Sequence, residues 1–296
     1  MSNIFLLLFI LGAIWGSSFF AIKISIETIN PITVASGRLL IAAFLLYVYY
    51  KSKNLSFNPN LKTIIIIIII GILGNFFPFF LISWSEQFIQ SNITGLLMSV
   101  GPIFALFLAH FMTKDDRFTY NKFFTILIGL IGVLFILGFD SLKGIFSNNF
   151  FLIFPKLTVI IATLGYVLSA IIAYNLKKIN IVTLTTFVTI SAAIMSIPFM
   201  LFVEYNNPSI PSLSSLISLI YLGFFPTAIA FLLRFHIISK AGPIYLSYVS
   251  YLIPGFAILW GYVFLGENIS IEALIGFIFV LVGIYFSQKY ANVKNN

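Results

Sequence analysis

The sequence predicts an all-α integral membrane protein with ten transmembrane helices, arranged as two inverted five-helix repeats. The 296 residues are 60% hydrophobic and only 8% charged, whereas a soluble domain carries about 25% charged residues. Ten segments are apolar and long enough to cross a bilayer, which takes about 20 residues. Similar Pro and Gly positions also recur roughly 151–152 residues apart, a sign of internal repetition.

The hydrophobic segments define the expected helices. Asn or Ser residues near several segment starts fit helix N-caps, and Pro31 fits a first helical turn. The connections are short, so we expect no domain outside the membrane. The predicted spans are about 4–22, 31–50, 63–84, 92–113, 122–139, 150–174, 182–203, 215–236, 243–265 and 271–288.

The repeat is carried by the order of segments and by their Pro and Gly positions. Residues 101–104 (Gly-Pro-Ile-Phe) match residues 253–256 (Ile-Pro-Gly-Phe), and residues 125–133 match residues 276–284. We therefore predict one repeat within 1–140 and a second within 150–290. Because five is odd, the copies must have opposite orientations, and inverted repeats of this kind usually build alternating-access transporters.

Basic residues predict the orientation. With the N-terminus inside, eleven of the 16 Lys and Arg residues fall on the N-terminal side, and three fall on the opposite side. The positive-inside rule then places both termini in the cytoplasm. The composition favours a bacterial source, so we expect a multi-pass protein of the cell inner membrane. The eleven are Lys51, Lys53, Lys62, Lys114, Arg117, Lys122, Lys177, Lys178, Lys240, Lys289 and Lys294.

The composition and motifs exclude several classes of function. No cysteine is present, which rules out disulfides and thiolate metal sites. The chain has no phosphate-binding glycine loop, no His-Glu-x-x-His run and no Ser-His-Asp set, so we expect neither an enzyme nor a cofactor or metal. The basic residues are scattered in loops and form no stripe, which argues against nucleic acid. The lipid bilayer is the expected partner besides a small-molecule substrate.

Two early motifs carry a resemblance to a known family. The run Trp15-Gly16-Ser17-Ser18-Phe19 is followed by Asn30-Pro31 and by Ser36-Gly37-Arg38. Together with the Gly101-Pro102 helix and the Gly266-Glu267 turn, these motifs resemble EamA-type transporters of the drug/metabolite superfamily over essentially the whole chain. Residues 114–117 (Lys-Asp-Asp-Arg) depart from the Gly-Glu pair that the family often has there.

The resemblance implies ten helices in two pseudo-symmetric halves, a central cavity, and export of small metabolites or amino acids. It also implies that helices 1, 3, 4, 6, 8 and 9 line the cavity, with helices 5 and 10 at the periphery.

Charged residues are the first candidates for the substrate site. Arg38 lies roughly 10 Å below the external surface by helix rise, so we expect it to face the bundle. It binds either an anionic substrate group or a structural partner. Glu86 ends the third span, where it could pair with a substrate, take up a coupling proton or simply face water. We expect Arg234 to lie at the cytoplasmic end of the eighth span and to reach the headgroups.

Uncharged candidates complete the predicted site. Asn75 precedes Pro78 within the third span, and Ser18 follows a Gly-x-x-x-Gly pattern; each could face the substrate or join helices. Aromatic residues could stack on a ligand or belong to interfacial belts. The aromatic candidates are Trp15, Trp84, Tyr166, Tyr248 and Tyr251.

These observations predict an alternating-access exporter of small, amino-acid-like metabolites, working through a nearly uncharged aromatic cavity. Proton exchange or the substrate gradient would drive it. The alternative within transport is uptake or exchange of a larger cationic metabolite such as S-adenosylmethionine, for which Glu86 is the candidate carboxylate. A membrane-embedded protein without transport activity is the remaining alternative.

Overall fold

The computed structural model describes residues 2–114, 116–137, 151, 153–265 and 271–291. All regular elements in this described part are helical. In chain order they are α1 (Ser2–Ile26), α2 (Pro31–Ser52), α3 (Leu61–Gly71), η1 (Ile72–Phe76), α4 (Phe77–Ser85), α5 (Ser91–Met98), α6 (Gly101–Met112), α7 (Tyr120–Leu137), α9 (Ile153–Tyr174), α10 (Ile181–Asn206), α11 (Leu213–Leu222), η3 (Gly223–Ile229), α12 (Ala230–Ser247), α13 (Val249–Leu265) and α14 (Ile271–Ala291).

The described helices fit a membrane protein. Seven of them are long and apolar enough to span a bilayer, and three shorter apolar helices accompany them. Large apolar side chains also cover the outside of the bundle, such as Phe44 and Phe202, which are 68% and 71% exposed. Water-soluble proteins rarely expose such continuous apolar surface, so this surface faces lipid.

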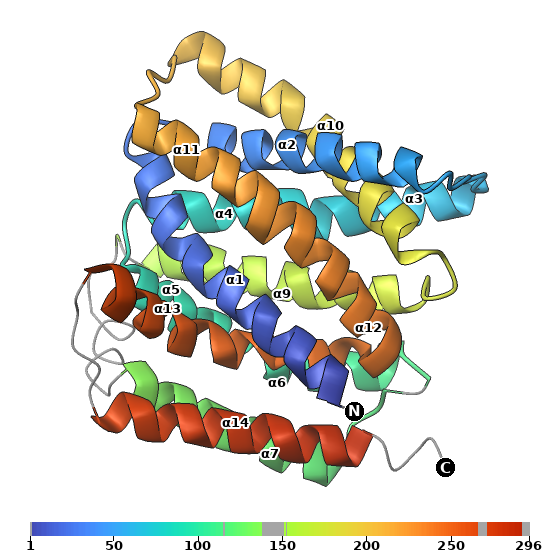
Figure 1. The fold of residues 1–296 in the computed structure, drawn as a ribbon, viewed down its shortest axis with the longest axis vertical. Helices are drawn as coiled ribbons and strands as arrows, with labels where there is room; N and C mark the ends of the chain where they lie inside the picture. The colour runs from blue at the N-terminus through green and yellow to red at the C-terminus, as the bar shows by residue number, and fades with distance from the viewer. Residues whose placement is uncertain (1, 115, 138–150, 152, 266–270, 292–296) are drawn as a thin grey trace.

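The helices form a bundle with two pairs at its edges (Figure 1). Helices α7 and α14 lie side by side along one edge, and α2 lies beside α10 at the opposite edge. Between them run α1, α4, α9, α12 and α13. The beginning of α1 and the end of α14 lie at the same end of the bundle.

Two long helices each contain a π-helical turn, in which the backbone hydrogen bonds span five residues. η1 connects α3 to α4, and η3 connects α11 to α12. Proline explains both turns: Pro78 cannot donate an N–H to the Gly74 carbonyl, and Pro226 cannot donate to Leu222. π-Turns often mark functional sites. The two turns begin about 151 residues apart, the spacing of the sequence repeat.

Two predicted spans have boundaries that differ from the sequence expectation. The span at 92–113 is divided into α5 and α6 at Ser99 and Val100, because Pro102 has no N–H for the carbonyl four residues earlier. The span at 215–236 continues beyond its expected end to Gly242, whose φ of 86° interrupts the helix. This extension places Arg234 inside the bundle.

Helices α7 and α14 approach closely because glycines line their contact. A Cβ atom on Gly132 would lie 2.6 Å from the carbonyl oxygen of Gly276, and one on Gly276 would lie 2.5 Å from that of Gly132. A Cβ on Gly283 would similarly lie 2.9 Å from the Thr125 carbonyl. Small residues permit this backbone packing between membrane helices.

Some sequence expectations lie outside the described residues. They concern the predicted junction at 140–150, the Gly266-Glu267 turn, Ser270 as the residue expected just before the span at 271–288, and Lys294.

Candidate functional site

A cavity lies in the middle of the bundle, with about 840 Å³ of space free of atoms, its opening included. Spaces between the helices of a bundle are common places for small-molecule sites. The wall is formed by α1, α2, α4, α9, α12 and α13, together with Met98 of α5 and Gly101 of α6. None of the described lining residues belongs to α7 or α14. Helix α2 contributes Arg38 to the wall, although the resemblance did not place this helix among those that line the cavity.

The structure brings four of the nine predicted site residues together on the cavity wall: Trp15, Ser18, Arg38 and Tyr166. The other five lie elsewhere, at Asn75, Trp84, Glu86, Tyr248 and Tyr251. Whether any of the nine binds a substrate stays a prediction.

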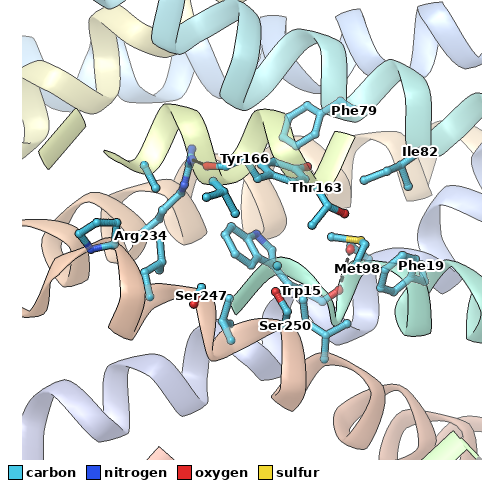
Figure 2. A pocket seen from close by; sticks show the side chains of 18 of the residues that line it. Trp15, Phe19, Phe79, Ile82, Met98, Thr163, Tyr166, Arg234, Ser247 and Ser250 are labelled. Atoms are coloured by element: carbon cyan, nitrogen blue, oxygen red, sulfur yellow. Dashed lines mark hydrogen bonds between the residues drawn. The ribbon is translucent and has the colours of Figure 1, made fainter. Parts of the chain in front are cut away.

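Trp15 occupies the centre of the wall (Figure 2). Its Nε1 donates to the carbonyl of Pro226 in η3 at 3.0 Å, and its ring centroid lies 6.4 Å from that of Tyr166. Arg234 lies toward one end of the cavity, while Phe19 and Met98 lie toward the other. The hydrogen bond fixes the indole, so the cavity has a preformed aromatic surface.

Arg38 is buried on α2, with a side chain only 3% exposed. Its Nε donates to the hydroxyl of Thr227 at 2.9 Å, and its guanidinium carbon lies 3.8 Å from the ring centroid of Phe79. That hydroxyl donates to the carbonyl of Leu222 at 2.7 Å. Arg38 is therefore tied to the carbonyl that Pro226 leaves without its helical donor.

Arg234 is a cavity residue that the sequence interpretation missed. It is 1% exposed, and its Nη2 donates to the Tyr166 carbonyl at 3.2 Å and to Ser169 Oγ at 2.6 Å. Its Nη1 lies 3.5 Å from the Gly74 carbonyl, which Pro78 leaves without its helical donor. The expected end of the span at 236 caused this error, because it placed Arg234 at the membrane surface.

The prediction of a nearly uncharged cavity was therefore wrong. Two buried guanidinium groups line a wall that is otherwise aromatic and aliphatic.

Three predicted aromatic residues have structural contacts away from the cavity. Tyr248 is fully buried, with its hydroxyl 2.6 Å from that of Thr125 on α7. Tyr251, also fully buried, donates to the carbonyl of Ile126 at 3.0 Å. Trp84 packs against Phe88 and Phe154 instead. These contacts join α13 to α7 and α4 to α9.

Glu86 and Asn75 are buried without hydrogen bonds to their side chains. The two carboxylate oxygens of Glu86 and both amide atoms of Asn75 lack a partner among the described residues. Lys23 is near Glu86 but donates to the main-chain carbonyls of Glu86 and Ile89. Glu86 lies just beyond α4, and burial raises the pKa of its carboxyl group above the ordinary value, opposed by the positive charge of Lys23.

A second acidic residue joins separate segments at the end of the bundle where α1 begins. Asp116 lies between α6 and α7 and forms an ion pair with Lys122 at 2.6 Å. Its other carboxylate oxygen accepts the N–H of Ile244 at 3.0 Å, directly after the interruption at Gly242. Asp116 thus caps the helical segment whose Pro243 and Leu246 line the cavity. Within the described residues no cluster of three His, Asp or Glu side chains could bind a metal.

Comparison with known proteins gives one family. A model of the EamA-like transporter family matches residues 3–138 and, separately, residues 152–288. The Bacillus subtilis uncharacterized transporter YoaV is 25% identical, over 93% of this chain and 92% of its own. An uncharacterized transporter of Archaeoglobus fulgidus is 28% identical, over 92% and 93% of the two chains.

Two further matches bear on substrate and fold. An S-adenosylmethionine/S-adenosylhomocysteine transporter of Chlamydia muridarum is 22% identical, over 94% of this chain and 89% of its own. A protein crystal structure matches 100% of both chains with a TM-score of 0.80 at 18% identity, a likeness of fold alone.

Proposed function

Because the chain belongs to the EamA-like transporter family, and so is a multi-pass membrane transporter of small metabolites, we propose that the central cavity is its substrate site. The observation that supports this most is the position of the cavity. Its wall includes Trp15 and Arg38, both anchored to the π-turn η3, and Arg234, which reaches η1. Interrupted helices with free backbone groups commonly form transporter sites.

We further propose ten transmembrane helices in two inverted repeats that move by alternating access. The first repeat lies within 1–140 and the second within 150–290. The separate family matches to 3–138 and 152–288 support this division. So does the spacing between η1 and η3. In this mechanism the two repeats rock about the cavity and expose it to one side at a time.

The proposed direction is export across the bacterial inner membrane, with both termini in the cytoplasm. The bias of basic residues supports this orientation, and so does the position of their loops. The connections after α2 and after α9, which carry Lys53 and Lys177, lie at the same end of the bundle as the start of α1. Proton exchange is the proposed driving force, with Glu86 as the candidate proton carrier.

Counterflow in proteoliposomes tests the transport site. Purified protein is reconstituted into vesicles preloaded with a mixture of amino and organic acids, and uptake of each labelled compound is measured. We expect saturable uptake of at least one compound, reduced about tenfold or more by Trp15→Ala because the aromatic wall is lost. Trp84→Ala is the matched control, since Trp84 lies outside the cavity. Equal losses in both variants would contradict the assignment of the cavity.

A further inference from the structure

We propose that the transported substrate is an organic anion with a net negative charge, and that Arg38 and Arg234 together bind its carboxylate or phosphate group. This inference rests on the proposed function of the cavity as the transport site. It replaces the amino-acid-like substrate and the larger cationic substrate that the sequence suggests.

The first argument is the absence of a counter-charge. Arg38 and Arg234 are 3% and 1% exposed and line the same cavity. Among the described residues, the ion pair between Lys122 and Asp116 is the only one, so neither arginine has a carboxylate partner there. Buried charges are normally paired, and the cost of burying them grows as the surroundings become less polar. The cavity therefore has two uncompensated positive charges.

The second argument is the geometry of Arg38. A guanidinium group has five N–H donors, and the hydroxyl of Thr227 takes only the one on Nε. Neither terminal nitrogen bonds to a described residue. The contact with Phe79 at 3.8 Å supports the flat face of the group, which leaves its edge for a ligand. That edge matches two oxygens of a carboxylate or a phosphate.

The third argument is the position of the two arginines around one aromatic pair. Arg38 lies over Phe79, Arg234 lies 5.8 Å from the ring centroid of Tyr166, and the two ring centroids are 6.5 Å apart. Three contacts to oxygen already hold Arg234 through its terminal nitrogens. Arg234 thus supplies a fixed positive charge, and Arg38 supplies the free donors.

The remaining wall is unsuited to a cation. Among the described residues that line the cavity there is no Asp or Glu. The hydroxyls of Ser18 and Ser247 donate within their own helices, to Trp15 and Ile244, each at 2.6 Å. An ammonium group would meet two like charges in a medium where Coulomb interactions are strong. The aromatic wall instead fits an apolar substrate body beside the anionic group.

A series of four probes of similar shape tests the inference: phenylpyruvate, phenyl phosphate, phenylalanine and phenethylamine. Their affinity for the purified protein in detergent is measured by calorimetry, and their counterflow in proteoliposomes. We expect the better of the two anions to bind at least about tenfold more tightly than phenylalanine, whose carboxylate can make the same bonds but whose ammonium group is repelled by the two arginines. We expect phenethylamine to bind weakest. The ratio between the two anions distinguishes a carboxylate site from a phosphate site.

Variants assign the effect to the arginines. Arg38→Gln is expected to reduce anion affinity about tenfold or more and to remove the preference over phenylalanine, while Arg38→Lys retains the charge and part of the preference. Arg234→Gln is expected to reduce the preference also. Lys53→Gln, an exposed loop residue, is expected to change neither.

The outcomes separate this inference from the proposed function. Tighter binding of phenylalanine or phenethylamine than of both anions would overturn the inference, and so would failure of both anions to bind. The wild-type series alone decides this, whether or not a variant folds. Counterflow of phenylalanine without an anion preference would leave transport intact and reject the anion. Anion binding that depends on Arg38 without any counterflow would support the anion site and contradict the transport site.

Discussion

Arg38 on α2 donates from Nε to Thr227 in η3 at 2.9 Å, and Arg234 on α12 reaches the carbonyl of Gly74 in η1. The family model matches two segments, 3–138 and 152–288. Each arginine thus lies in one segment and contacts the π-turn of the other. At both turns a proline lacks the N–H that would bond to a carbonyl one turn earlier. Arg234 donates directly to one of these carbonyls, that of Gly74. Arg38 reaches the other, that of Leu222, through the hydroxyl of Thr227.

Thr227→Val tests the link between Arg38 and η3. The substitution keeps the shape of the side chain but removes the hydroxyl that accepts from Arg38 and donates to Leu222. Loss of a buried hydrogen bond to a charged group costs about 1.5–3 kcal/mol, so we expect a lower melting temperature in detergent. Thr227→Ser retains the hydroxyl and is expected to melt close to the wild type. Equal destabilisation by both would assign the effect to packing.

Glu86→Gln tests the proton carrier. Burial raises the pKa of the Glu86 carboxyl group, so its protonated form persists to a higher pH than for an exposed glutamate, and it ionises only as the pH rises further. We expect wild-type transport to respond to a pH gradient and the Glu86→Gln variant, which cannot ionise, to lose that response. The measurement is proteoliposome flux with and without the gradient. Glu27→Gln, at an exposed residue, should retain the response; a pH response that survives Glu86→Gln would exclude this role.

Gly132→Ala tests the contact between α7 and α14. The added Cβ would lie 2.6 Å from the Gly276 carbonyl oxygen, which is backbone and cannot rotate away. Overpacking of this kind costs about 1–3 kcal/mol, so the melting temperature should fall while substrate affinity is retained, because neither helix lines the cavity. Gly95→Ala is the control, since its nearest neighbour is a Pro254 side-chain atom at 3.8 Å.

Asp116→Asn tests the cap on the interrupted α12. The amide weakens the ion pair with Lys122 and the hydrogen bond to the N–H of Ile244. Because the two side chains are 11% exposed, we expect a loss of about 1–3 kcal/mol, below that of a fully buried pair. The drop in melting temperature is compared with that of Lys114→Gln, an exposed neighbour. No drop would mean that water replaces the ion pair without cost.

The membrane class and the helical segments could be predicted from the sequence because they depend on local hydrophobicity. Pro78, which the sequence places within the third span, lies just after η1, which interrupts that span. The cavity wall was less predictable. In the sequence, Tyr248 and Tyr251 look like aromatic residues that could bind a ligand. In the structure, their hydroxyl groups contact α7 instead. Helix rotation decides this difference, and a sequence without a strong amphipathic pattern does not specify rotation.

The burial of Arg234 depends on two structural features that the local sequence does not predict. The helix had to extend to Gly242, and carbonyls from η1 and α9 had to be available as partners. Both depend on contacts between distant segments.

The crossed contacts of the two arginines have a consequence for how such a chain could be divided. If the segments up to 138 and from 152 onward were produced as separate polypeptides, each would carry a guanidinium group whose acceptors at the π-turns lie on the other polypeptide. Arg234 would keep its bonds to Tyr166 and Ser169 within its own fragment. Its contact with Gly74 and the bond from Arg38 to Thr227 would form only when the two fragments assemble. These two crossed contacts favour assembly of the unlike fragments, and we expect the co-produced fragments to form a heterodimer rather than two homodimers.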